Sequence, residues 1–302
     1  MMSWNLNDNR PKLLFKEPFS TKYTLHITTS ILSGGIELNS KAEIRWQVDI
    51  KNINDKGEAD LNIITLHHRL LENNSPIISD MSGISNVFAS MYNEIEVQVD
   101  STGKILKVYN LDTIKKKWSW VKKDMEALLE QNEGFKDMIL TNDELYSSSE
   151  KIQMAIEANE FFEVYFNHFW GRSLPGGKSN INKFNLFSTS PIEWRYDFRS
   201  VHNSTLMDDV KCVRIKGTPV TIIDKNWVGN AYSAFAHLQL KKTVPILEDK
   251  AEYLVTSFGK IIHASIKRQE IVDPELLFAK YSYELFTEDK NELDPFKESV
   301  NG

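Results

Sequence analysis

The sequence predicts an α+β fold in which one strongly curved antiparallel sheet, or two sheets related by approximate repetition, is half-barrel-like in shape and packs on two central helices. Three observations lead to this fold class. Segments on both sides of the middle alternate apolar and polar residues with period two, which is typical of half-buried strands. The middle, residues 111–171, repeats its apolar residues at three- and four-residue spacing, which favours helices. A sheet with one polar face also needs a cover over its apolar face.

The first third of the chain is predicted to form strands. Alternation is strictest over residues 41–50, whose apolar side holds Ala42, Ile44, Trp46, Val48 and Ile50. A turn-like Asn-Asp-Lys-Gly sequence follows, so we expect a hairpin between residues 41–53 and 58–70. Further strand candidates are residues 23–28, 95–99 and 104–108.

Two helices are predicted in the middle. The first covers residues 112–132, with Asp112 or Thr113 as its cap. The second covers residues 143–170 and ends at Gly171. It carries a stripe of aromatic residues that we expect to pack into the concave face of the sheet, namely Phe162, Tyr165, Phe166, Phe169 and Trp170.

Strands are predicted to resume after a loop at residues 171–183. Residues 192–199 again alternate strictly between apolar and charged side chains. The residues after Asp273 fit both a helix start and a strand, and both readings stay open. The remaining strand candidates are residues 210–216, 219–223, 231–241, 251–257 and 260–267.

These patterns divide the chain into four segments, which form one or two compact domains. They are an N-terminal β-rich half at 1–110, a helical segment at 111–171, a C-terminal β-rich half at 172–287 and a frayed acidic tail at 288–302.

The two β-rich halves show a hint of internal duplication. Residues 95–108 and 251–264 share Glu, Val, Ser, Gly, Lys and Ile at one offset. The alternative is that any hairpin with a Gly-Lys turn has this appearance, because the turn needs glycine for its positive φ.

Composition bounds the function. The chain has 36 basic and 42 acidic residues, so its net charge of −6 gives no reason to expect nucleic acid as a partner. Its one cysteine, Cys212, excludes an intrachain disulfide and a cysteine-rich zinc site. No apolar run approaches the ~20 residues of a membrane helix, so no membrane insertion is expected. Without a signal-like start we expect a cytoplasmic protein, and a trimmed exported form is the alternative.

No motif indicates a catalytic residue, a cofactor or a metal. The segment Arg172–Ser179 resembles a phosphate-binding loop but lacks its first glycine and the strand-to-helix context. His67 and His68 are adjacent on a predicted strand, so they point to opposite faces and do not share an ion. No Gly-x-Ser-x-Gly sequence occurs. Whether the protein is an enzyme stays open, and the sequence favours a protein without catalytic activity.

The most unusual local feature is a basic segment with interleaved tryptophans. Residues 104–123 carry seven lysines and one acidic residue. Segregated charge favours oriented contacts with another protein, and an oligomer is also compatible with it. The predicted partner-binding residues are Lys115, Lys116, Lys117, Trp118, Trp120, Lys122 and Lys123.

The leading functional hypothesis is therefore a non-catalytic binding or assembly protein that acts through protein–protein contacts. The order of strands, helices and strands resembles bacterial half-barrel carriers of lipoproteins or lipids, in architecture only. This resemblance implies the first alternative, a carrier of a hydrophobic or lipid-like ligand in the concave face. Its cavity residues would be Trp46, Phe162, Phe166, Trp170, Trp194, Tyr196 and Phe198. An unrecognised hydrolase is the second alternative.

Overall fold

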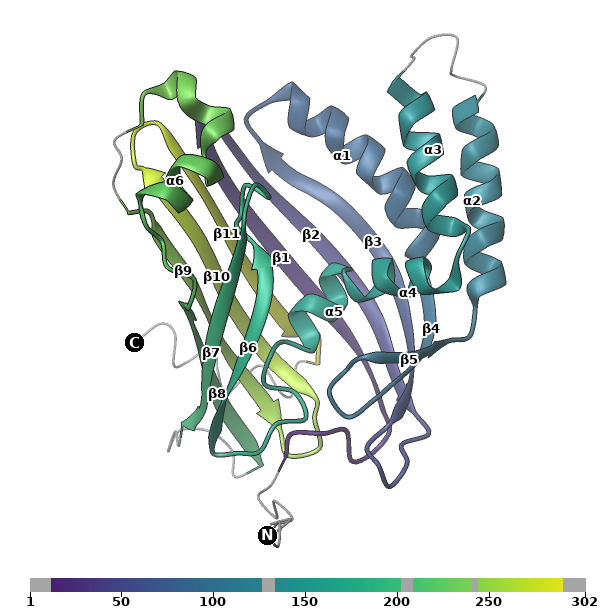
Figure 1. The fold of residues 1–302 in the computed structure, drawn as a ribbon. Helices are drawn as coiled ribbons and strands as arrows, with labels where there is room; N and C mark the ends of the chain where they lie inside the picture. Colours follow the sequence, from purple (N-terminus) through teal and green to yellow (C-terminus); the bar gives the residue numbers. More distant parts are fainter. Residues whose placement is uncertain (1–11, 127–133, 202–208, 241–243, 290–302) are drawn as a thin grey trace, which may run out of the picture.

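The computed structural model in Figure 1 describes residues 12–126, 134–201, 209–240 and 244–289 and has an α+β architecture built on one large antiparallel sheet. The sheet has eleven strands and is not closed. Six helical segments and two 3₁₀ turns accompany it, and α4 and α5 lie over one face, which we call the inner face (Figure 1). The predicted fold class is thus confirmed at this level.

The N-terminal half contributes five strands to the sheet. The hairpin predicted between residues 41–53 and 58–70 is present and longer than expected, because β2 and β3 pair along almost their whole length. The strands are β1 (Phe19–Ser33), β2 (Ile36–Lys51), β3 (Ala59–Asn73), β4 (Glu94–Val99) and β5 (Ile105–Val108).

The C-terminal half contributes the other six strands. They are β6 (Gly176–Phe184), β7 (Pro191–Val201), β8 (Val210–Pro219), β9 (Ile246–Thr256), β10 (Ile261–Asp273) and β11 (Leu277–Thr287). The order across the sheet is β5-β4-β3-β2-β1-β11-β10-β9-β8-β7-β6, so β1 and β11 join the two halves and β5 and β6 are the edges.

The expected loop at residues 171–183 is wrong, because most of it belongs to β6. Its two glycines suggested a turn. In the structure they lie in the strand, and a Cβ at Gly177 would come within 2.5 Å of the Phe198 ring. Glycine is needed there for close packing against β7, which a pattern based on turn propensity does not reveal.

The helical segments differ from the two that were predicted. The middle of the chain holds α2 (Leu111–Glu126), α3 (Gly134–Tyr146), α4 (Ser149–Glu157) and α5 (Glu160–Tyr165). The predicted second helix is divided because the side chains of Ser148 and Asn159 accept backbone N–H bonds and start new helices at α4 and α5. The end of the predicted first helix lies outside the described residues.

Helices also occur inside both β-rich halves. They are α1 (Pro76–Ala89) with the turn η1 (Ser90–Tyr92), and α6 (Lys225–Ala231) with the turn η2 (Ser233–Leu238). The expected strand at 231–241 is therefore wrong, because Asp224 accepts the Trp227 N–H at 2.8 Å and caps a helix at this point. The ambiguous segment after Asp273 forms the strand β11.

The same element order recurs in the two halves. Each has three strands, a helix and then two strands, and β11 follows the second set. Residues 95–108 and 251–264, which share sequence, occupy the fourth and fifth strands of their sets. Duplication itself stays a prediction, since hairpins with a Gly-Lys turn also explain the shared residues.

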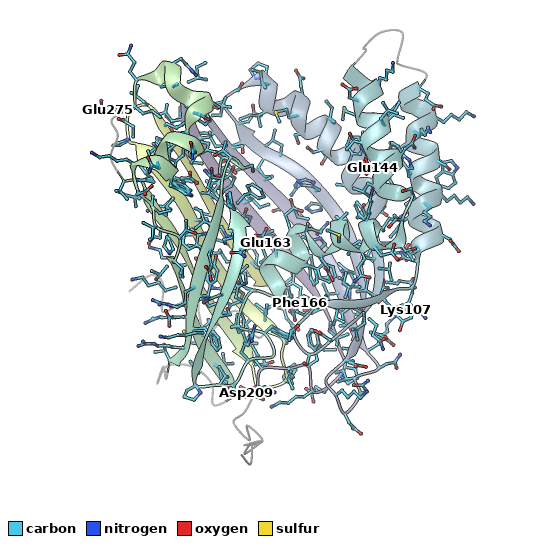
Figure 2. All side chains as sticks on the ribbon, in the orientation of Figure 1. Lys107, Glu144, Glu163, Phe166, Asp209 and Glu275 are labelled. Atoms are coloured by element: carbon cyan, nitrogen blue, oxygen red, sulfur yellow. The ribbon has the colours of Figure 1, made fainter. Side chains whose placement is uncertain are left out.

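The core lies between the inner face of the sheet and the helical layer. Tyr165, Phe169 and Trp170 from the predicted aromatic stripe are almost fully buried there. Gly103 in the β4–β5 turn adopts φ +85°, and a Cβ at this position would lie 2.2 Å from the Phe166 ring, which Figure 2 labels. The aromatic layer and the hairpin therefore fit each other closely.

Within the described residues, no helix has both the length and the apolar character needed to cross a membrane.

Candidate functional site

A large groove lies on the outer face of the sheet, which is the face opposite to α5. Its volume is about 1360 Å³, and it runs from β6 to β10. Because strand residues alternate between faces, the side chains that line it are the outward-pointing ones. We call it the outer groove, and its charged and polar outward-facing side chains are Lys178, Asp197, Arg199, Arg214, Lys216, Thr218, Glu248, Lys250, Glu252, Ser265, Lys267 and Gln269.

Like charges lie side by side across the floor of the outer groove. Lys216 on β8 is directly opposite Lys250 on β9, and Lys250 is directly opposite Lys267 on β10. On the next row, Arg199 on β7 is opposite Arg214 on β8. Directly opposed like charges destabilise a sheet, because their side chains stand only about 5 Å apart. The strand register thus places several cations side by side on this face, with Asp197 opposite Lys216 and Glu252 opposite Arg214.

The carboxylates of the groove are already paired with some of these cations. Arg214 Nε lies 2.5 Å from Glu252 Oε2 and Lys250 Nζ lies 2.6 Å from Glu248 Oε1. Asp197 is 3.6 Å from Lys178 Nζ. No carboxylate of the described residues lies within 4.0 Å of the three remaining cations, which are all exposed: Arg199, Lys216 and Lys267. These three groups are available to an anionic ligand.

A buried ionic network lies beneath the groove, on the inner face of the same strands. Asp249 on β9 pairs with Lys183 on β6 and accepts a hydrogen bond from the Tyr196 hydroxyl at 2.8 Å. Arg268 on β10 lies 3.4 Å from Asp249 and pairs with Glu163 on α5. Figure 2 shows Glu163 where the helical layer approaches β6. The network ties α5 to the sheet.

The buried charges of this network shift one another's pKa values. Burial would raise the pKa of Asp249, but the adjacent Lys183 and Arg268 lower it overall. Burial lowers the pKa of Lys183, and Asp249 opposes that effect. Burial and the charge of Lys183 lower the pKa of His168 to about 3, so this histidine is neutral.

The space beside the network is too small for a substrate. The cavity next to Lys183, Trp194 and Arg268 has a volume of about 20 Å³. One water needs roughly 10–15 Å³ on this kind of measure. Arg268 Nε and Trp194 Nε1 are buried and make no hydrogen bond, so a water here would satisfy them. The charged groups here therefore contact one another, and the space beside them is close to the size of one water.

The predicted partner-binding residues differ in how exposed they are. Trp118 is only 5% exposed, stacks on Tyr146 and donates its indole N–H to Asp143 at 2.9 Å. Lys122 is held by Asp143 at 2.6 Å, and Lys117 is hydrogen-bonded to Asn93. The others lie on the remaining helix surface, where Lys115 is half-buried, Lys116 and Lys123 are exposed and Trp120 is 58% exposed. Partner binding by these residues stays a prediction.

The predicted cavity residues all belong to, or pack against, one hydrophobic core. Those near α5 contact one another as Phe162–Phe166 and Phe166–Trp170 pairs, with ring centroids 5.7 and 5.5 Å apart. Trp46 packs instead on Phe161, and Trp194, Tyr196 and Phe198 line the inner face of β7. The structure gives these residues packing partners, while a ligand-lining role stays a prediction.

Sequence reasoning missed the outer groove, although a signal for it was present. The alternation at 192–199 placed Arg195, Asp197 and Arg199 on a solvent face, which is the usual place for charge. What the sequence does not contain is the strand register, and only the register aligns the lysines of three different strands.

Among the described residues, no three His, Cys, Asp or Glu side chains gather as a metal-binding group, and Cys212 is buried on β8. No model of a known protein family matches the chain, and no curated protein matches it either.

Proposed function

We propose that this chain is a non-catalytic binding protein whose outer groove holds an extended, acidic segment of another protein. The observation that carries the proposal is the row formed by Lys216, Lys250 and Lys267, together with the unpaired Arg199. Opposed lysines cost free energy in the isolated sheet, and an anionic partner would remove that cost.

The chemistry of the groove favours a polypeptide over a nucleic acid. None of the side chains that line it is aromatic, so it offers no platform on which bases could stack. It also holds the carboxylates Asp197, Glu248 and Glu252, which repel a continuous run of phosphates. A polypeptide can place its acidic residues beside the free cations and polar residues such as Ser and Gln elsewhere.

The test uses a fluorescently labelled peptide of alternating Glu and Ser residues and measures its affinity by anisotropy. We expect binding that weakens as salt is added, because surface charge is screened. The variant Lys216→Glu/Lys267→Glu should bind at least roughly 30-fold less tightly, since each lost contact is worth about 1 kcal/mol at 4 Å in water and the new carboxylates also repel the peptide. Circular dichroism would establish that the variant keeps its sheet.

Two further variants make the result specific. Lys51→Glu/Lys56→Glu changes the charge equally at exposed positions outside the groove and should bind like the wild type. Lys116→Glu/Lys123→Glu tests the exposed lysines of α2. The proposal is overturned if the groove variant retains full affinity, if only the α2 variant loses it, or if an oligonucleotide of equal charge binds more tightly than the peptide.

A further inference from the structure

The two open edges of the sheet are protected to different degrees. The β5 edge is short, with four residues, and its pairing with β4 contains a register shift. Helix α4 also covers its backbone: Ile105 N donates to Glu157 Oε1 at 3.0 Å, and Gln153 Nε2 donates to Ile105 O at 2.8 Å. Short length, a bulge and a covering element are the usual ways to block strand addition.

The β6 edge lacks these protections. It has nine residues, contains no proline, and pairs with β7 in one unbroken antiparallel register. Two flanking bonds fix the phase of the ladder, since Ser200 N donates to Pro175 O at 2.7 Å and Asn185 N donates to Ser190 O at 2.9 Å. Odd-numbered residues of β6 therefore bond to β7. The backbone N–H and C=O groups of even-numbered residues point away from β7, toward the open edge of the sheet.

The backbone groups on the open edge form a continuous row with which another strand could pair. They belong to Lys178, Asn180 and Asn182 in the centre of the strand, whose side chains are exposed on the outer face. No backbone group elsewhere in the described parts of the chain bonds to these three residues. An unpaired row of N–H and C=O groups on a strand of this length is a site for strand addition by another chain.

The side chains on either side of this edge define what would fit beside it. On the outer face, Lys178 lines the outer groove and favours an acidic neighbour. On the inner face, Ser179 is buried with an unpartnered hydroxyl, and the half-buried Ile181 follows it. A strand beside β6 would thus place acidic residues outward and small or β-branched residues inward, because cross-strand neighbours share a face.

We propose that β6 accepts, as an added strand, one part of the acidic segment, and that the continuation of the segment crosses the outer groove, whose lysine row runs across the strands. The segment has Asp or Glu at alternate positions, with Thr, Val or Ser between them. The inference rests on the proposed function, and it adds main-chain hydrogen bonding to the charge contacts already described. Main-chain bonds then supply affinity, and Lys178 and Ile181 supply selectivity.

The test uses a labelled peptide of alternating Glu and Thr and two N-methylated forms of it. In an added strand, alternate peptide N–H groups point toward β6 and away from it. Methylation of the N–H groups that point toward β6 blocks the bonds to it, whereas methylation of those that point away leaves the bonds intact. One form should therefore bind at least about tenfold less tightly than the other, since each lost bond weakens the complex. Equal affinities for the two methylated forms would overturn the added strand.

A protein variant gives a second, independent readout. Asn180→Pro removes an outward N–H and leaves the bonds to β7, so it should weaken binding of the unmethylated peptide at least about tenfold. Asn180→Ala keeps the N–H, removes the side-chain bond to Glu193 and should bind like the wild type. If Asn180→Pro does not fold, the methylated peptides decide alone.

The outcomes separate this inference from the proposed function. Loss of binding in Lys216→Glu/Lys267→Glu, with full binding in Asn180→Pro and no effect of methylation, overturns strand addition and leaves the groove as the site. Full binding in both protein variants overturns both proposals.

Discussion

At the scale of single residues, the outer face of the N-terminal half is organised around Glu43. Its carboxylate contacts His67 Nε2 at 2.8 Å, Arg69 at 2.7 Å and His26 Nε2 at 3.1 Å. These side chains come from β1 and β3, on either side of β2, so one carboxylate links three strands. The bond from His67 is the largest effect, and together the partners lower the pKa of Glu43 from its ordinary 4.5 to about 2.

This shift makes a pH-dependent contribution to stability. A carboxylate with a lower pKa in the folded state stabilises the fold above its unfolded pKa, and that stabilisation is lost as the pH falls through the folded pKa. We expect Glu43→Gln to lower the free energy of unfolding by about 1 kcal/mol at neutral pH. The difference from the wild type should shrink between pH 4.5 and about 2, as measured by urea unfolding. A difference that is constant over this interval would contradict the assignment.

The buried charged residues of β10 show which part of the structure the sequence did not predict. The strand predicted at 260–267 extends to Asp273, and its alternation continues inward with Arg268 and Glu270. Charged residues at inward positions were a readable sign of a buried polar network. Most of their partners were not readable, because Glu163, Asn185 and Tyr232 lie on other elements that are distant in the sequence.

At the scale of elements, strands with strict alternation were predictable and strands without it were not. The β2–β3 hairpin and β7 have one apolar and one polar face, so their pattern sufficed. β6 contains two glycines and few apolar residues, and it is a strand only because β7 pairs with it. The helical middle was recognised by its spacing, but its division depended on the caps Ser148 and Asn159.

The cover that α4 forms over β5 can be removed by mutation. Glu157→Ala/Gln153→Ala leaves the Ile105 N–H and C=O without their present partners. We expect the free energy of unfolding to fall by about 2 kcal/mol, because two hydrogen bonds to a partly buried backbone are lost. We also expect self-association through the exposed edge, which sedimentation velocity would detect. The surface variant Met154→Ala on the same helix, at a site 67% exposed, serves as the control and should change neither property.

At the scale of the whole molecule, both halves share one sheet and one core. β1 and β11 pair over eleven consecutive positions, from Tyr23–Thr287 to Ser33–Leu277. The main hydrophobic cluster includes residues from both halves and from the helical layer. The fold class was predictable from alternation and helical spacing. The choice between one sheet and two, the strand order and the open edges were not, because they are set by long-range pairing.

This unity predicts cooperative unfolding. Hydrogen exchange at increasing urea should show that β2–β3 and β9–β10 lose protection at the same concentration, because breaking either half exposes the shared core. Two clearly separated midpoints would show that the halves are stable on their own and would contradict this expectation.

The β5 edge, which α4 covers, also limits how large an assembly built on β6 can become. A copy of the chain that receives a strand has no second template to offer, because side chains of α4 already occupy the opposite end of its sheet. Under the proposed strand addition, we therefore expect recruitment to end after one guest, with a one-to-one stoichiometry and no head-to-tail propagation into filaments.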